Sequence, residues 1–405
     1  MMQKTVWIVN QYAGSPKHGM EYRHYYLAQE FVNKGYRVAI LSGSYSHLFT
    51  EQPHVSDIYN HEQISDIDYY WLKVPSYKKS TSLGRIINML VFTYRFYKLP
   101  KKKLAKPDII IVSSPSLFPI LPAKRWAKKY GAQLIFEVRD IWPLTLEALS
   151  GLKSHHPLIW LMKKVERYAY RNSDYIVSLL PNAKSHFVTQ GMAAEKFSYI
   201  PNGIDLNEVT QATPLSLIIE NQIPKDKFIV GYTGAIGISN ALEYLIDAII
   251  QLQEHTDIFF VIVGKGDRKA ELQEKCSTCN NVLFLPPIPK NQIQSILRFF
   301  DICFIAMHQV PLYQYGISLN KMFDYMYSGK PILASLESPN NPAEQSGGSL
   351  MVAPENTEAI IRGILELKSM DPENRQVMGN KGKAFVLANH TYQSIAKKYI
   401  ALFKD

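Results

Sequence analysis

The stretch Gly316-Ile-Ser-Leu-Asn-Lys-Met-Phe-Asp-Tyr-Met-Tyr-Ser-Gly-Lys-Pro-Ile-Leu-Ala334 predicts a helix followed by a short buried strand. Ser318 is a candidate N-cap, because its hydroxyl could accept a hydrogen bond from an amide of the first helical turn. Gly329 suits the position just beyond a helix end, and Pro331 prevents the helix from continuing. We therefore expect about three helical turns and then a strand over residues 332–334.

The start of this helix is a candidate binding site for a nucleoside diphosphate. The amides of the first turn lack partners inside a helix and carry a partial positive charge. Lys321 falls in that turn and Asp324 in the next. The amides and Lys321 would face phosphates, while Asp324 would accept hydrogen bonds from ribose hydroxyls. The alternative is an ordinary capped helix with a solvated polar end, and the rest of the chain must decide between the two.

Length and composition predict a two-domain globular protein. The chain has 405 residues, of which 46% are hydrophobic, enough for two cores of ordinary size. It contains no run of 18 apolar residues, and its first residues lead into a strand pattern without a signal peptide, so we expect a cytoplasmic protein. Cys276 and Cys279 form an isolated Cys-x-x-Cys pair, and Cys303 stands alone. We assign them no metal or redox role, because further zinc ligands are missing nearby.

The net charge of +10 favours an anionic partner. Between Tyr77 and Lys106 the chain has no Asp or Glu but nine basic residues, namely Lys78, Lys79, Arg85, Arg95, Lys98, Lys101, Lys102, Lys103 and Lys106. The same stretch has apolar residues at helical spacing, namely Leu83, Ile86, Ile87, Leu90, Val91, Tyr94 and Tyr97, with Phe92 and Phe96 beside them. Such a helix predicts docking on anionic lipid headgroups, with Arg85, Lys101, Lys102 and Lys103 as lipid contacts. The alternative is a buried helix with solvated basic ends. Nucleic acid is disfavoured, because no nucleic-acid-binding signature accompanies the charge.

Strand and helix patterns alternate along both halves of the chain. Residues 5–9, a Gly-containing loop over 11–19, a helix over 20–33 and a strand over 37–41 form a βαβ opening. A second unit begins with the strand 228–232. We therefore expect α/β domains with doubly wound parallel sheets, which bind ligands at the carboxyl ends of their strands.

The predicted domains are residues 1–205 and 228–387. Between them, residues 206–227 lack strong periodicity and contain Pro214 and Pro224, which predicts a linker. The terminal helix, within 388–405, is expected to pack back onto the first domain.

Two groups of charged residues flank predicted strands of the first half. Arg139 and Asp140 follow the buried strand 133–136 and are predicted to be cleft residues, with a structural ion pair as the alternative. Asp66 and Asp68 could hold a divalent metal, but they lead directly into a strand pattern. A solvated strand edge is the favoured interpretation of that pair.

Four motifs resemble the signatures of the retaining family 4 glycosyltransferases of the GT-B fold. They are Pro201-Asn-Gly-Ile-Asp205, Gly231-Tyr-Thr-Gly234, Val263-Gly-Lys-Gly266 and Phe323-Asp-Tyr-Met-Tyr-Ser-Gly-Lys-Pro331, in the family's order along nearly the whole chain. Glu137-Val-Arg-Asp-Ile-Trp-Pro143 and the segment 319–326 further resemble a fucosamine-transferase-like branch of bacterial O-antigen and capsule assembly.

The resemblance implies two Rossmann-like domains facing a cleft and a peripheral membrane enzyme that needs no metal. It implies transfer of a sugar, such as an N-acetylated amino or deoxyamino sugar, from a UDP-sugar to a polyprenyl-diphosphate-linked sugar acceptor. The implied catalytic residues are Arg139, Asp140 and Lys321. The implied nucleotide-sugar contacts are Gly234, Ala235, Gly237, Gly264, Gly266, Arg268, Ile288, Gly316, Ile317, Ser318, Leu319, Asn320, Lys321 and Asp324. The implied acceptor contacts are His18, Gly19, Met20, Glu21 and Arg23.

The chain also departs from the family pattern. The family has two glutamates eight residues apart, and these positions are Gly316 and Asp324 here. Its basic diphosphate pair falls near Ile236 and Asn240, neither of which is charged, so Lys321 is the expected replacement and Arg268 the second choice. These departures keep open a sugar-nucleotide epimerase, which would give product without an acceptor, and a non-catalytic relative, which would bind nucleotide without turnover.

Overall fold

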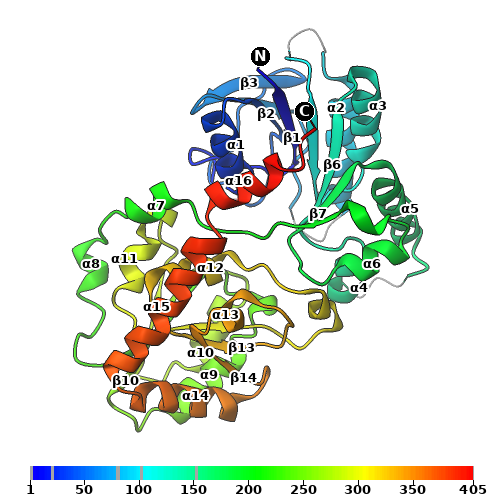
Figure 1. The fold of residues 1–405 in the computed structure, drawn as a ribbon. Helices are drawn as coiled ribbons and strands as arrows, with labels where there is room; N and C mark the ends of the chain where they lie inside the picture. Colours follow the sequence, from blue (N-terminus) through cyan, green and yellow to red (C-terminus); the bar gives the residue numbers. More distant parts are fainter. Residues whose placement is uncertain (1–2, 20–21, 79–82, 101–103, 151–153, 405) are drawn as a thin grey trace. The chain divides into compact units, whose positions relative to one another are not determined.

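The computed structural model describes residues 3–19, 22–78, 83–100, 104–150 and 154–404, and divides into two units (Figure 1). Unit 1 comprises residues 1–201 together with 392–405. Unit 2 comprises residues 202–391. Each unit is an α/β domain with its own sheet and core, as the alternation of patterns predicted.

Unit 1 is built on an eight-stranded sheet in the order β3-β4-β2-β1-β5-β6-β7-β8. All neighbours are parallel except β3 and β4, which form a hairpin. The strands are β1 Thr5–Val9, β2 Arg37–Gly43, β3 Tyr59–Ile64, β4 Ile67–Leu72, β5 Ile109–Ser113, β6 Gln133–Val138, β7 Tyr175–Ser178 and β8 Phe197–Tyr199. The central strands β1 and β5 are buried along their whole length, which explains their unbroken apolar sequences.

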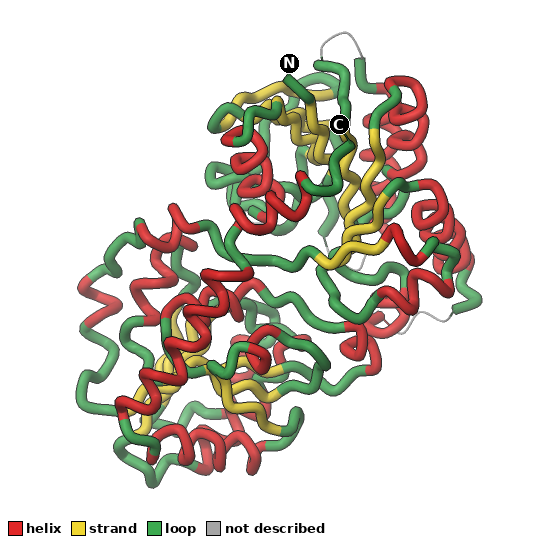
Figure 2. Tube along the Cα trace, viewed as in Figure 1, coloured by secondary structure: helices red, strands yellow, loops and turns green. Residues whose placement is uncertain are grey.

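Helices cover both faces of this sheet (Figure 2). The helices of unit 1 are α1 Arg23–Asn33, α2 Leu83–Lys98, α3 Ile120–Tyr130, α4 Leu144–Ser150, α5 Pro157–Asn172, α6 Lys184–Thr189 and α16 Tyr392–Ile400. α1 packs against α16, while α2, α3 and α5 form a layer on the other face. The C-terminal helix therefore returns to the sheet with which the chain began, and Phe31 and Tyr399 meet edge to face.

Unit 2 is built on a six-stranded parallel sheet in the order β11-β10-β9-β12-β13-β14. The strands are β9 Phe228–Thr233, β10 Ile258–Val263, β11 Val282–Leu285, β12 Ile302–Ala306, β13 Ile332–Ser335 and β14 Ser349–Val352. The helices are α7 Leu206–Thr210, α8 Leu217–Glu220, α9 Glu243–Gln251, α10 Lys269–Lys275, α11 Ile293–Leu297, α12 Asn320–Ser328, α13 Pro342–Gln345, α14 Thr357–Ser369 and α15 Pro372–Asn389. This is the doubly wound arrangement predicted for the second half.

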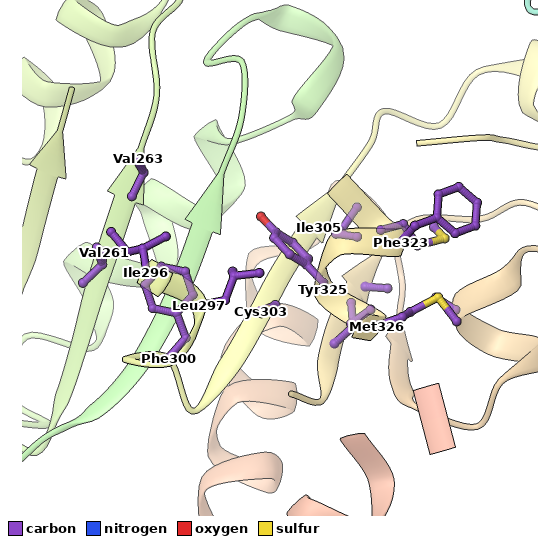
Figure 3. Packing of buried hydrophobic residues seen from close by; sticks show 14 of the residues in the cluster. Val261, Val263, Ile296, Leu297, Phe300, Cys303, Ile305, Phe323, Tyr325 and Met326 are labelled. Carbon is purple, nitrogen blue, oxygen red and sulfur yellow. The ribbon is translucent and has the colours of Figure 1, made fainter. Parts of the chain in front are cut away.

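Successive residues of each central strand in unit 2 serve two different cores. Val261 and Val263 pack with α11 and α12, whereas Phe260 and Ile262 pack with α9 and α14. Side chains alternate between the faces of a strand, so strands covered on both sides are apolar throughout. Figure 3 shows the first of these cores, in which the Phe300 ring lies against β9. Gly231 makes room for that ring, because a Cβ there would stand 1.9 Å from it.

The segment predicted as a linker is part of unit 2. Residues 206–227 contain α7 and α8, and Val209, Leu215 and Ile223 are buried in the same core as α12. Both helices are short, which explains why periodicity did not reveal them. The borders of unit 1 fall at residues 201 and 392, a few residues from the predicted 205 and 388.

The pair Asp66 and Asp68 belongs to the β3–β4 hairpin, where Asp66 is exposed, as expected, and Asp68 is paired rather than solvated. Ser65 and Asp66 have positive φ angles of 49° and 62° and make the turn. Asp68 is ion-paired with Arg37 at 3.2 Å and hydrogen-bonded to His61 Nε2 at 2.7 Å. None of the helices in the described parts of the chain is long and apolar enough to cross a membrane.

Candidate functional site

Two glycine-containing loops meet at the carboxyl ends of β9 and β10. The amide of Gly234 donates to Val263 O at 2.9 Å, and the amide of Ile236 donates to Lys265 O at 2.9 Å. Gly264 has φ +155°, and a Cβ there would stand 1.9 Å from Gly234 O. The sequence predicted that these glycines let backbone approach a phosphate. In the structure, Gly264 and Gly266 let one loop approach the other.

A methyl group at position 264 is therefore expected to push the two loops apart. Gly264→Ala should lower nucleotide affinity at least about tenfold, because a 1.9 Å contact with a carbonyl cannot be relieved by a side-chain rotation. Calorimetric titration with UDP measures the effect. Gly237→Ala is the matched control, since Gly237 has an ordinary extended backbone and its Cβ would meet only Asp267 at 3.4 Å. Equal affinities for the two variants would contradict this account.

Lys321 places a cation beside these loops. It lies in the first turn of α12, and its ammonium donates to Tyr232 Oη at 2.6 Å and to Asn240 Oδ1 at 2.7 Å. The ammonium also lies 4.1 Å from the centre of the Tyr232 ring. None of the ion pairs found among the described residues involves Lys321, and burial lowers its pKa to about 7. An anion bound beside the ammonium would raise this pKa and so keep Lys321 protonated.

Gly234 is the residue that gives Lys321 its space. A Cβ at position 234 would stand 2.9 Å from the ammonium and 3.0 Å from Cε, and its φ of +144° also favours glycine. The predicted Gly234 and Lys321 therefore lie together. Ala235 contributes its carbonyl, which accepts a hydrogen bond from Tyr232 Oη at 2.6 Å.

The amino end of α12 differs from the prediction. The helix begins at Asn320, one residue later than a Ser318 cap would allow, and Leu319 precedes it without a side-chain capping bond. Ser318 Oγ instead accepts from the Asn202 amide at 3.2 Å. Ile317 is buried and Leu319 is partly buried in the hydrophobic core, so these two residues could offer a ligand only their backbone groups. Gly329 has φ 73° at the helix end, as predicted.

Gly316 has a backbone conformation that a glutamate would adopt only with strain. Its φ is 108°, in the region that side-chain-bearing residues avoid. It follows the 3₁₀ helix Pro311–Tyr315 and donates its amide to Tyr313 O at 3.0 Å. The departure from the family pattern at this position is thus built into the local backbone.

Asp324 is buried and already paired. Lys290 donates to both carboxylate oxygens of Asp324 at 2.6 Å, and Gln294 binds the Asp324 carbonyl at 3.0 Å. Lys290 lies just after Ile288, which packs partly buried against the core of unit 2. A ribose that binds Asp324 would therefore meet a carboxylate whose charge is balanced by Lys290.

Arg268 forms ion pairs with two carboxylates. Its guanidinium lies 3.0 Å from Glu243 and 2.5 Å from Glu271. Hydrogen bonding to Glu271, the largest cause, raises the pKa of Arg268, against a smaller opposing effect of burial. Glu243 also lies 3.5 Å from His308, which in turn bonds Glu355 at 2.6 Å. Arg268 thus joins a network of ion pairs, and its role as a second diphosphate ligand stays a prediction.

In unit 1, Arg23, a predicted acceptor contact, is bonded to a buried carboxylate and to backbone carbonyls. Its guanidinium is buried and donates to Glu137 Oε2 at 2.9 and 3.0 Å, and to the carbonyls of Ile200 and Pro201. Glu137 also accepts from Ser113 at 2.7 Å and from Tyr399 of α16. Burial opposes ionisation of Glu137, but the Arg23 charge prevails and holds the pKa of that carboxyl well below its usual range. Four hydrogen bonds of the Arg23 guanidinium are thus made within unit 1.

The other predicted acceptor residues that the structure describes are also buried or constrained. The His18 ring lies tilted against the Trp71 ring, with centroids 4.7 Å apart, and bonds Ser15 Oγ at 2.9 Å, while burial lowers its pKa. Gly19 has φ +91°, and a Cβ there would stand 2.7 Å from Thr50 Oγ1. Both residues therefore shape the loop before α1. Met20 and Glu21 lie outside the described residues.

Arg139 and Asp140 follow β6, as predicted. The amide of Arg139 donates to Ser114 Oγ at 2.9 Å, and Asp140 is exposed. The Arg85 guanidinium lies at the same carboxyl-terminal side of the sheet, 5.3 Å from the Tyr12 ring and 5.6 Å from the Trp142 ring, and it donates to Tyr12 Oη at 3.1 Å. The Arg85 guanidinium therefore contacts aromatic side chains of unit 1, and its assignment as a lipid contact stays a prediction. Lys101, Lys102 and Lys103 lie outside the described residues.

Three residues of the donor-side arrangement were not predicted. Tyr232 and Asn240 hold Lys321, and Lys290 neutralises Asp324. Tyr232 stands inside the Gly231–Gly234 motif, which could have drawn attention to it. Lys290 gives no such signal, because it comes from a proline-containing segment 34 residues before its partner. In the parts of the chain that the structure describes, no group of three or more His, Cys, Asp or Glu is arranged to hold a metal.

Each unit matches a model of a known protein family. Residues 18–208 match the model described as Glycosyltransferase Family 4. Residues 227–369 match the model described as Glycosyl transferases group 1. The two matches follow one another and leave only a short gap near the border of the units.

Individual relatives have low sequence identity to this chain but align with most of its length. WcaI of Escherichia coli K12, assigned as a glycosyl transferase of colanic acid biosynthesis, is 24% identical over 309 residues, which cover 73% of this chain and 75% of WcaI. Sucrose-phosphate synthase of Thermosynechococcus elongatus superposes with a TM-score of 0.75 at 16% identity, over 99% of this chain and 98% of the other. HepE of Anabaena, solved in complex with UDP and glucose, gives a TM-score of 0.65 at 14% identity, over 98% of both chains. The structural matches extend over both units and therefore concern the fold of the whole chain.

Proposed function

We propose that this chain, which has the GT-B fold and matches glycosyltransferase models over both of its halves, transfers a sugar from a UDP-sugar to a lipid-linked sugar acceptor in the synthesis of a bacterial surface polysaccharide. The observation that carries the proposal is Lys321, whose enclosed ammonium has two neutral oxygen partners and lies against the glycine loops of unit 2. HepE, a protein of the same fold, was solved with UDP and glucose. WcaI is assigned to the synthesis of a polysaccharide, colanic acid.

On the donor side, the diphosphate would bind Lys321 and the first amides of α12. The ammonium of Lys321 lies close to Gly234, so phosphate oxygens could approach the backbone there as well. The ribose hydroxyls would donate to Asp324, whose carboxylate has lone pairs beyond the two that Lys290 uses. Uracil is the base that the family resemblance implies.

The reaction would proceed with retention of the anomeric configuration and without a metal. The bond from the anomeric carbon to the diphosphate breaks, and negative charge develops on the leaving phosphate. A bond from that carbon to the acceptor hydroxyl oxygen forms on the same face of the sugar, and the hydroxyl proton passes to the leaving diphosphate. A fixed cation and helix dipole aimed at that charge stabilise the transition state more than the ground state. Lys321 supplies that cation from the protein itself, so a divalent ion has no required role in this proposal.

On the acceptor side, the exposed Asp140 and the neighbouring Arg139 are the proposed contacts in unit 1. Arg23, His18 and Gly19 would act indirectly, by holding the loop before α1 and the strand that carries Glu137. The acceptor we propose is a polyprenyl-diphosphate-linked sugar of O-antigen or capsule type, and the transferred residue an N-acetylated amino or deoxyamino sugar. Such an acceptor would place the protein at the inner membrane surface.

Product analysis tests this function directly. UDP-sugars incubated with a detergent-dispersed polyprenyl-diphosphate sugar should give one glycosylated lipid for each UDP released, with the anomeric configuration of the donor retained in NMR spectra. EDTA should leave the rate unchanged. Conversion of the UDP-sugar without any acceptor would indicate an epimerase instead.

Gly316 favours one second candidate, a relative that binds nucleotide-sugar without catalysis. Its backbone conformation disfavours the carboxylate that the family carries near the donor sugar. Saturable UDP-sugar binding with no turnover for any acceptor would support that candidate over the transferase.

A further inference from the structure

Helix α2 exposes an apolar stripe in addition to the side that it buries. Met89, Phe92 and Phe96, on one side of the helix, are buried within unit 1. On the other side, large apolar side chains are exposed, namely Leu83 by 77%, Ile87 by 54%, Leu90 by 46% and Tyr94 by 57%. Exposed apolar residues in a contiguous helical stripe indicate a surface that is covered in use.

A cationic pocket lies where the end of this stripe meets α3. Its volume is about 190 Å³, and it is lined by Tyr97, Lys98, Leu99, Arg125, Trp126 and Lys129. Arg125 donates to Tyr97 Oη at 2.8 Å, and Lys129 lies 5.9 Å from the centre of the Trp126 ring. Among the described residues, no carboxylate is paired with Lys98, Arg125 or Lys129. Three cations therefore surround a space with room for one small anionic group.

The stretch of sequence that forms the pocket carries little negative charge. From Tyr77 to Phe136 the sequence has one acidic residue, Asp108, whose carboxylate accepts from the Thr5 amide. The same stretch has thirteen basic residues, namely Lys78, Lys79, Arg85, Arg95, Lys98, Lys101, Lys102, Lys103, Lys106, Lys124, Arg125, Lys128 and Lys129. In the same layer of helices, α5 exposes Trp160 by 56%, with the Lys164 ammonium 3.6 Å from its ring centre.

We propose that this surface docks on an anionic phospholipid bilayer, with a lipid phosphate held in the pocket of Lys98, Arg125 and Lys129 and the α2 stripe set among the lipid chains. The inference rests on the proposed lipid-linked acceptor and deepens it. Phosphate matches the three cations, and hydrocarbon matches the stripe. A nucleic acid would satisfy the cations but would leave Leu83 and Ile87 against water. A second copy of the chain would bring another cationic surface to the same place.

Vesicle flotation tests the proposal with the full chain. The protein should bind vesicles of phosphatidylcholine with phosphatidylglycerol more tightly than phosphatidylcholine alone, and less tightly in high salt. The triple variant Lys98→Gln/Arg125→Gln/Lys129→Gln should bind the anionic vesicles about 100-fold more weakly, since each cation near such a surface adds roughly a fivefold factor. Lys34→Gln/Lys225→Gln/Lys381→Gln removes the same charge from exposed lysines elsewhere and should bind like the wild type.

The other readouts separate this inference from the proposed function. Leu83→Asn/Ile87→Asn should weaken binding to both kinds of vesicle, and inorganic phosphate at millimolar concentration should not release the wild type. Equal vesicle binding by the two triple variants would contradict the claim that the pocket of Lys98, Arg125 and Lys129 holds a lipid phosphate. Self-association without vesicle binding, or binding to an oligonucleotide but not to vesicles, would overturn lipid as the occupant. If the protein transfers sugar to a detergent-dispersed acceptor but does not bind vesicles, the proposed function is supported and only the inference of membrane docking is wrong.

Discussion

Replacing Lys321 by Met is expected to weaken UDP binding by about 2–3 kcal/mol, or roughly 30- to 150-fold, because a hydrogen bond to a charged group contributes that much. Met has a similar length and volume, so the loops beside Gly234 keep their packing. Turnover should fall further, since an electrostatic contact to the leaving group contributes about 100- to 1,000-fold to catalysis. Calorimetry gives the affinity, and initial rates of UDP release give kcat/KM.

Lys265→Met is the matched control for this substitution. Lys265 belongs to the loop between β10 and α10, and it is exposed. The Lys265→Met substitution removes one positive charge near the glycine loops and leaves the Lys321 ammonium in place. A similar loss of affinity in both variants would mean that only the general positive potential matters, which would contradict the role of Lys321.

The pH profile of binding gives Lys321 a second signature. Burial lowers its pKa to about 7 in the free protein, so the ammonium loses its proton as the pH rises through that value. A bound diphosphate favours the charged form, so above pH 7 binding must be accompanied by proton uptake. UDP affinity should then fall about tenfold per pH unit until the pKa of the bound state is reached. Lys321→Met should show a nearly flat profile over the same range.

Arg23→Met is expected to destabilise unit 1 by about 3–5 kcal/mol, because it leaves the fully buried Glu137 without its ion pair. The same change removes the donors to the carbonyls of Ile200 and Pro201. All five tryptophans of the chain, Trp7, Trp71, Trp126, Trp142 and Trp160, lie in unit 1. Urea unfolding followed by tryptophan fluorescence therefore reports on this unit separately.

Two further variants test the cause of this loss. Arg23→Met/Glu137→Leu should regain much of the stability, since replacing both partners of a buried pair by apolar groups removes the unpaired charge. Arg37→Met breaks an exposed pair with Asp68 and should cost less than about 1 kcal/mol. The contribution of Glu137 depends on pH with the sign of a lowered carboxyl pKa: it is present at neutral pH and lost as acid protonates the folded protein. Equal losses in Arg23→Met and the double variant would contradict the ion-pair explanation.

Strands with unbroken apolar sequences could be predicted from sequence, and a strand with a polar sequence could not. The strand β1 begins and ends at the predicted residues 5 and 9, because an unbroken apolar run identifies a strand that is buried on both faces. The edge strand β3 was missed because Asn60, His61 and Gln63 are exposed and polar, so that no apolar run marks it. The short helices α7 and α8 were read as linker for a similar reason.

The site was predictable where local sequence positions a residue and unpredictable where distant segments meet. Lys321 follows from its place in a helical turn next to a predictable helix end. Its partners Tyr232 and Asn240 lie 89 and 81 residues away, and Arg23 meets Glu137 across 114 residues. Both Arg23 and Arg268 carry a charge that suits a phosphate or a sugar, but only the folded structure reveals the carboxylates that occupy them.

Calorimetric titration of the wild type with UDP, GDP, ADP and TDP, repeated with Lys321→Met, tests the central claim most directly. The account predicts saturable binding of one nucleotide per chain, preference for UDP, and a loss of roughly 30- to 150-fold in the variant. Absence of heat with all four nucleotides, or UDP binding that is unchanged in Lys321→Met, would contradict a nucleoside diphosphate site at the amino end of α12.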